Sequence, residues 1–152
     1  MRTTRREFLI SAAGVGTVSG LPVTSARATS AMLEAAIRSV VAKSAVQKGK
    51  VTLDVPPLVE NGNAVPVSII VDSPMTEADH VKAIHVFNEK NPQPYVISVI
   101  LGPRAGRARV STRIKLADAQ RVVAIAEMSD GSFWSGEANV VVTIAACVED
   151  VN

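Results

Sequence analysis

Hydrophobic and polar positions alternate along much of the chain beyond residue 50, and this period of two predicts β-strands. The clearest run covers residues 107–116. One set of alternate positions holds small and aliphatic side chains, together with one threonine: Ala108, Val110, Thr112, Ile114 and Leu116. The other set is polar and mostly cationic: Arg107, Arg109, Ser111, Arg113 and Lys115. We therefore expect a strand with one buried face and one solvated, positively charged face.

Further strands are predicted where apolar runs end at Pro, Gly or Asn turns: 51–55, 65–71, 81–87, 96–101, 122–128, 133–136 and 140–144. Ahead of them, residues 30–44 carry apolar side chains at helical spacing, which predicts a short amphipathic helix with Ser30 as its N-cap. Together the elements predict an all-β fold, an immunoglobulin-like antiparallel β-sandwich of about seven strands with a short N-terminal helix.

The first 28 residues have the pattern of a twin-arginine export signal. Arg5 and Arg6 precede a weakly apolar stretch, and Ala26-Arg27-Ala28 has the small-x-small form of a cleavage site. We expect a signal peptide over 1–28, a sandwich domain over 29–144 and a C-terminal arm over 145–152. The mature chain is expected in the periplasm and without a membrane span, because no long apolar run follows the signal.

Charge and aromatic content argue against a nucleic-acid partner. The whole chain has 16 basic and 14 acidic residues, and four of the basic and one of the acidic residues fall in the signal. The remaining 12 and 13 give a net charge of −1, so the mature chain is not basic. Aromatic residues make up only 3% of the chain, too few for a base-stacking platform.

Cys147 is the only cysteine, so it cannot form an intrachain disulfide. In an oxidising compartment such a thiol is inert, reactive, or half of an intermolecular disulfide. His80 and His85 are the only histidines, and they stand five apart in a predicted strand, where they would face opposite ways. We expect surface or edge histidines and no metal site, although a cysteine-dependent enzyme that uses His80 or His85 stays open.

Three segments carry a family resemblance: "RARVSTRIKLA", "VVAIAEMSDGSFW" and the closing "VTIAAC". With the signal and the near-terminal cysteine, they resemble SoxY, the sulfur-carrier subunit of the bacterial thiosulfate-oxidising Sox system. The resemblance implies that the chain is not an enzyme, needs no cofactor and carries sulfur intermediates covalently on Cys147. If the last strand ends near Ile144, an extended arm gives that cysteine a reach of about 10 Å.

The resemblance also implies partners. SoxY pairs with SoxZ as a heterodimer, and here the aliphatic run 96–101 could extend a sheet across such an interface. The carrier docks transiently with a SoxXA cytochrome, a SoxB hydrolase and a SoxCD-type dehydrogenase. A disulfide-linked dimer through Cys147 is a further alternative. The cationic face of Arg107, Arg109, Arg113 and Lys115 is either a solvated strand face or a docking face for an acidic partner.

The arm departs from the family pattern, in which the cysteine stands in Gly-Gly-Cys-Gly-Gly. Here Ala145 and Ala146 precede the cysteine, and Val148-Glu149-Asp150 follow it. The methyl groups restrict the backbone, and the two carboxylates disfavour a thiolate and repel anionic thiosulfate. Two functions therefore stay open: a sulfur carrier with an altered arm, and a structural or regulatory SoxY paralogue that pairs with SoxZ without carrying sulfur.

Overall fold

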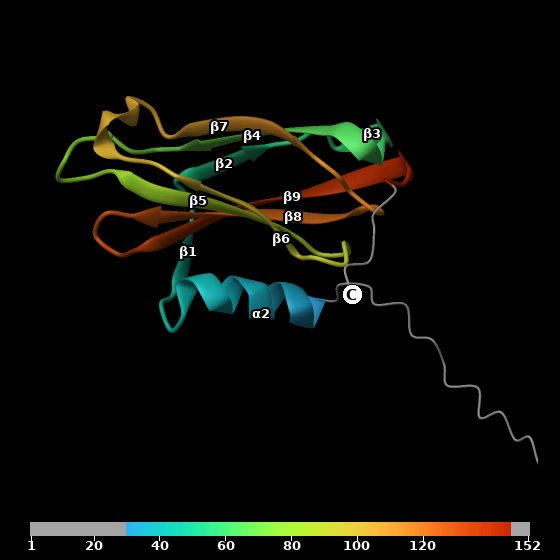
Figure 1. The fold of residues 1–152 in the computed structure, drawn as a ribbon, viewed down its shortest axis with the longest axis horizontal. Coiled ribbons are helices and arrows are strands. Elements are labelled where there is room, and N and C mark those ends of the chain that lie inside the picture. Colours follow the sequence, from blue (N-terminus) through green and yellow to red (C-terminus); the bar gives the residue numbers. More distant parts are fainter. Residues whose placement is uncertain (1–29, 147–152) are drawn as a thin grey trace, which may run out of the picture.

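The computed structural model describes residues 30–146, which form two β-sheets packed face to face and one helix (Figure 1). The helix α2 spans Ser30–Val41. The nine strands of this region are β1 Val46–Lys48, β2 Val51–Asp54, β3 Leu58–Asn61, β4 Val65–Val71, β5 Val81–Asn88, β6 Tyr95–Ile100, β7 Arg109–Ile114, β8 Gln120–Met128 and β9 Phe133–Ile144. Two short 3-10 helices, η1 Gly62–Ala64 and η2 Pro103–Ala105, complete it. The predicted immunoglobulin-like sandwich is confirmed.

The larger sheet has the strand order β1-β9-β8-β5-β6, with β3 also paired to β9, and the smaller has the order β2-β4-β7. Two of the strands, β1 and β3, were not predicted from the sequence, because they are too short to show a period of two. Both run parallel to β9, so the sandwich is not purely antiparallel as expected. The predicted segments 133–136 and 140–144 are one continuous strand, β9.

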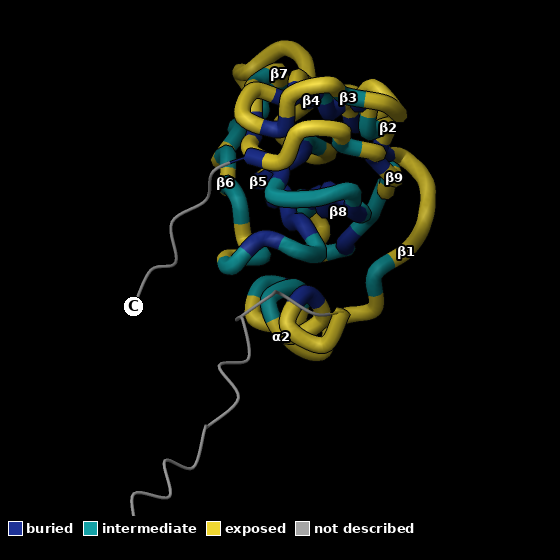
Figure 2. Tube along the Cα trace, turned by 90° about the vertical axis from the view of Figure 1, so that its right-hand side faces the viewer, coloured by how far each residue is buried: buried dark blue, intermediate teal, exposed yellow. Residues whose placement is uncertain are grey.

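Apolar side chains cover both faces of the larger sheet. Its inner face packs against the smaller sheet, where Val67, Ile69 and Ala124 are buried. Its outer face carries Phe87 and Ile125 beneath α2, which forms a separate layer (Figures 1 and 2). Burial on both faces explains why the central strands β5 and β8 are almost continuously apolar in sequence.

The helix differs from its prediction at both ends. Its last residue is Val41, and Ala42 follows with a φ of 53°, so the helix ends three residues earlier than expected. Ser30 is the first helical residue, and its hydroxyl contacts the Glu89 carboxylate at 2.6 Å. Within residues 30–146 no helix has the length and apolar character needed to cross a membrane.

The alternation predicted for residues 107–116 is confirmed. Ala108, Ile114 and Leu116 are buried, while the cationic positions between them are exposed. β7 is an edge strand of the smaller sheet, and its outer face is the outer face of the sandwich. The predicted signal, residues 1–28, lies outside the described residues, as do Cys147 and Val148.

Candidate functional site: the base of the C-terminal arm

The chain remains attached to the sandwich for two residues after β9 ends at Ile144. Ala145 is exposed, but Ala146 is buried, with 8% of its surface accessible. The Ala146 amide donates a hydrogen bond to the carbonyl oxygen of Leu116 at 3.0 Å, and Leu116 is fully buried behind β7. The chain is therefore still bound to the sandwich at Ala146, the second residue of the predicted arm 145–152.

Gly62 is the residue that lets these segments meet. It is the first residue of η1, next to β3 and the end of β9 (Figure 1). A β-carbon at this position would lie 2.3 Å from the Leu116 carbonyl oxygen, 2.8 Å from the Ala146 nitrogen and 3.0 Å from a methyl group of Val142. The Leu116 amide also donates to the Gly62 carbonyl at 2.9 Å. We call Gly62, Leu116 and Ala146 the arm anchor.

Asn91 fixes the peptide groups on both sides of Leu116. Its Nδ2 donates to the Lys115 carbonyl at 2.9 Å, and its Oδ1 accepts from the Ala117 amide at 3.0 Å. Gln120 Nε2 donates to the same Oδ1 at 2.8 Å. The Asn91 and Gln120 side chains are both buried, and buried amides of this kind hold one geometry because unmade hydrogen bonds are costly.

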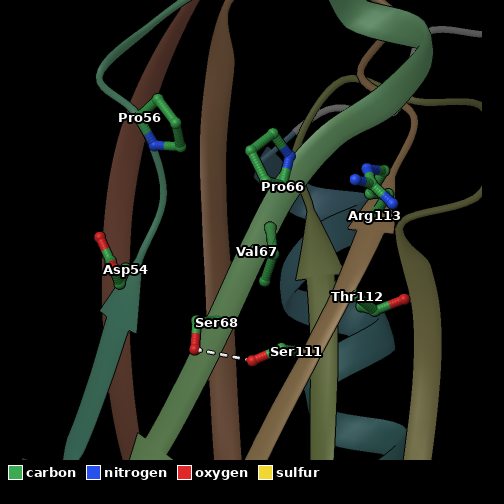
Figure 3. Close-up of a pocket in the computed structure, with 8 residues that line it drawn as sticks. All are labelled: Asp54, Pro56, Pro66, Val67, Ser68, Ser111, Thr112 and Arg113. Atoms are coloured by element: carbon green, nitrogen blue, oxygen red, sulfur yellow. Dashed lines mark hydrogen bonds between the residues drawn. The ribbon is translucent and has the colours of Figure 1, made fainter.

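The four predicted docking cations, Arg107, Arg109, Arg113 and Lys115, are all exposed. Within residues 30–146 none of them has a salt bridge to a carboxylate. Arg113 borders a shallow groove of about 670 Å³ on the outer face of the smaller sheet, and a hydrogen bond of 3.0 Å joins Ser68 and Ser111 on its floor (Figure 3). Asp54 lines the same groove, so it is not purely cationic.

A second groove of about 330 Å³ includes Arg107 and Arg109 in its lining. The sheet thus aligns the predicted cations along one face. Lys115 is the member of the set that adjoins the arm anchor, because it directly precedes Leu116.

His85 is buried, so the expectation of a surface or edge position is wrong for this residue. The reason is that β5 is an inner strand between β6 and β8, and His85 shares the face of Phe87 that α2 covers. Its Nδ1 lies 2.9 Å from the Tyr95 hydroxyl, and its Nε2 is buried without a hydrogen-bond partner among the described residues. Burial lowers the pKa of His85, and the carboxylate of Glu127 partly opposes this shift.

His80 is half-buried and precedes β5, so the alternation argument does not apply to it. Its Nδ1 lies 3.1 Å from the Thr76 carbonyl oxygen. Within the described region, no group of three or more His, Cys, Asp or Glu side chains could hold a metal ion.

The sulfur oxidation protein SoxY family matches residues 37–147, which is most of the chain. This chain belongs to the SoxY family. The matched region includes the buried core of the sandwich and the arm anchor, and it ends at Cys147.

A solved structure of a SoxY protein agrees with this membership, and two others share the fold. The sulfur carrier protein SoxY from Chlorobium limicola f thiosulfatophilum is 26% identical, with a TM-score of 0.64, and the alignment covers 76% of this chain and 100% of that one. A superoxide reductase (neelaredoxin) variant from Ignicoccus hospitalis is 17% identical, covers 72% and 86% of the two chains and has a TM-score of 0.56. The superoxide reductase from Nanoarchaeum equitans is 11% identical, covers 63% and 100%, and has a TM-score of 0.53.

These reductases share the fold alone with this SoxY-family chain. No curated protein matches it. The sequence did not reveal the roles of Gly62 and Asn91, because each stands in a segment with the composition of a turn or loop. Their role depends on segments that are far apart in sequence, and only the fold brings those segments together.

Proposed function

We propose that this SoxY-family chain is a periplasmic sulfur carrier, not an enzyme, which holds thiosulfate-derived intermediates covalently on Cys147 during sulfur oxidation. The observation that carries the proposal is the family match, which runs to Cys147 and ends there. The likeness to the sulfur carrier protein of Chlorobium limicola supports it. Ala146 is the last described residue and is bound to the sandwich, so the residue that bears the thiol is joined to the domain by one peptide bond.

The carried chemistry starts with thiosulfate. A sulfur–sulfur bond forms between the Cys147 Sγ and the outer sulfur of thiosulfate, with loss of the thiol proton and of two electrons. A c-type cytochrome of the SoxXA kind accepts the electrons. A SoxB-type hydrolase then adds water across the bond between the sulfane and sulfonate sulfurs, which releases sulfate and one proton and leaves a persulfide, S–SH, on Cys147. A SoxCD-type dehydrogenase would oxidise this remaining sulfane sulfur.

A direct test is to load the purified mature protein. The chain is incubated with thiosulfate and the matching cytochrome complex, and intact mass and peptide mapping should show a thiosulfonate on Cys147. The Cys147→Ser variant is the negative control, and a SoxY with the Gly-Gly-Cys-Gly-Gly arm is the positive control. Failure of this chain to gain the adduct while the positive control loads would contradict the proposal.

A SoxZ-like partner is part of the same proposal. β6 is an edge strand of the larger sheet, and Tyr95 and Ile100 are exposed on it, at 41% and 77% of their surface. An edge with open backbone groups and apolar side chains favours sheet extension by a second protein. Co-expression followed by size-exclusion chromatography should give a heterodimer, and recovery of this chain alone as a monomer would count against it.

Export by the twin-arginine pathway is also proposed, on the pattern of residues 1–28. Replacing both Arg5 and Arg6 by lysine should leave the precursor in the cytoplasmic fraction, whereas Arg2→Lys should not. Equal export of the two variants would remove this part of the proposal.

A second candidate function is a structural or regulatory subunit that does not carry sulfur. The burial of Ala146 and its bond to Leu116 favour it, because they shorten the arm. The Cys147→Ser variant distinguishes the candidates in a strain that depends on this copy. Growth on thiosulfate is lost if Cys147 carries the sulfur, and it is kept if the chain acts only through its partners.

A further inference from the structure

We propose that Gly62 is a positioning residue: it allows Ala146 to bind Leu116, so that the cysteine-bearing segment starts from a fixed point on the domain. The inference rests on the proposed function, because it concerns how the Cys147 thiol is presented to a partner. Three segments that are distant in sequence build this point, namely η1, the residues after β7 and the residues after β9.

The anchor depends on the absence of a side chain at residue 62. A β-carbon 2.3 Å from the Leu116 carbonyl oxygen and 2.8 Å from the Ala146 nitrogen is far inside van der Waals contact with two main-chain atoms. Main-chain atoms cannot relieve the clash by a change of rotamer, as the end of a long side chain can. An added methyl group must therefore displace η1 from Leu116, or displace Ala146 from the Leu116 carbonyl.

The Leu116 peptide, to which Ala146 binds, is itself fixed by buried contacts. Leu116 is fully buried, and the Asn91 side chain binds the peptide groups before and after it. The carbonyl that receives the Ala146 amide therefore has a fixed direction. This distinguishes the contact from the fraying end of an exposed strand.

Covalent geometry then limits where the thiol can act. Consecutive α-carbons are 3.8 Å apart, so the Cys147 sulfur lies within roughly 7 Å of the Ala146 α-carbon. An arm released from Ile144 would gain about two residues, or roughly 7 Å of further reach. A partner that reacts with an anchored thiol must bring its reacting group close to this end of the sandwich, where Ile144 is 65% exposed and Lys115 is exposed.

The test uses Cys147 as the only labelling site of the chain, with a nitroxide attached through a disulfide. The Gly62→Ala variant is compared with Gly102→Ala, whose added methyl group would meet nothing within 4 Å. We expect the wild type and Gly102→Ala to show a restricted label and broadening of amide resonances near Leu116. In Gly62→Ala the label should become mobile, and the Ala146 amide should exchange about tenfold faster or more.

A second variant, Ala146→Pro, removes the donor N–H at the arm base and leaves η1 intact, so it should mobilise the label even if Gly62→Ala fails to fold. The proposal is overturned if folded Gly62→Ala, or Ala146→Pro, retains the wild-type label spectrum, or if the wild-type label is already fully mobile. These measurements need no sulfur donor. Failure of the anchor is thus separate from failure of Cys147 to form a thiosulfonate.

Discussion

The amide of Ala146 donates a hydrogen bond to the carbonyl oxygen of Leu116 at 3.0 Å, and this bond joins the residues after β9 to the residues after β7. A strand that merely ended at Ile144 would leave the following residues in solvent. Here Ala146, two residues after the end of β9, is buried next to Gly62. The predictions below concern the groups that hold this arrangement, the surface around it, and the buried His85.

Replacing Asn91 by alanine should destabilise the domain. The substitution removes three hydrogen bonds and leaves the Lys115 carbonyl, the Ala117 amide and the Gln120 side chain without this partner. A buried polar group left unpaired costs about 1–3 kcal/mol. Because the Lys115 and Ala117 bonds are only part-buried and Gln120 Nε2 keeps its bond to the Asp118 carbonyl, we expect a total loss of about 2–3 kcal/mol in the free energy of unfolding. Urea denaturation measures it. Asn139→Ala, at an exposed position on β9, should stay within about 0.5 kcal/mol of the wild type.

The buried His85 should make the domain less stable in mild acid. Its pKa is lowered in the folded state, so between that pKa and the ordinary value of 6.5 the unfolded chain binds more protons than the folded one. The stabilisation is complete above pH 6.5 and is lost as the pH falls from there to the folded-state pKa. The slope from one proton is at most about 1.4 kcal/mol per pH unit.

The measurement is a series of urea transitions between about pH 7.5 and pH 5. His85→Gln keeps a polar partner for the Tyr95 hydroxyl but cannot titrate, so its stability should fall less steeply with acid than that of the wild type. Equal slopes for the two proteins would show that His85 does not control this loss.

Replacing Ile144 should slow the partner-dependent loading of Cys147 but should not change the intrinsic reactivity of its thiol. Ile144→Ser removes an exposed apolar side chain two residues from the anchored Ala146. We expect cytochrome-dependent thiosulfonate formation to slow by roughly tenfold, the effect of losing a moderate interface contact. Alkylation of Cys147 by iodoacetamide should be unchanged. Met32→Ser, on the exposed side of α2, is the matched control, and equal slowing in both variants would contradict a local contact.

The salt dependence of partner association should show whether the cationic face of β7 is a docking face or only solvated surface. If it docks an acidic partner, Arg113→Glu should slow association, and the difference from the wild type should shrink as ionic strength rises. Stability should hardly change, because Arg113 is exposed and has no salt bridge within residues 30–146. Lys43→Glu, an exposed cation just after α2, is the control. Identical association rates for all three proteins would identify the face as solvated surface.

Sequence periodicity predicted the sandwich well where one face of a strand is solvated. β7 shows this best, because the exposed Arg109 and Arg113 alternate with the partly buried Val110 and Thr112 and the buried Ile114. Periodicity could not predict the burial of His85. β5 is apolar on both faces, and a nearly continuous apolar run does not show that α2 covers the second face. Nor could periodicity find the anchor. Gly62 has the sequence context of a turn, and its tight fit against Leu116 exists only after three distant segments are brought together.

The anchor is made of main-chain atoms alone, so it does not require an alanine at residue 146. A glycine there, as in the family arm, could form the same bond to Leu116 but would gain more freedom on release. Alanine in place of glycine at a compatible position is worth about 0.4–1 kcal/mol. Relative to a glycine, the alanine at residue 146 should therefore raise the ratio of bound to released arm base by about two- to fivefold. We therefore expect the alanine at residue 146 to change how often the bond to Leu116 is open, and to leave the geometry of the closed bond as a glycine would have it.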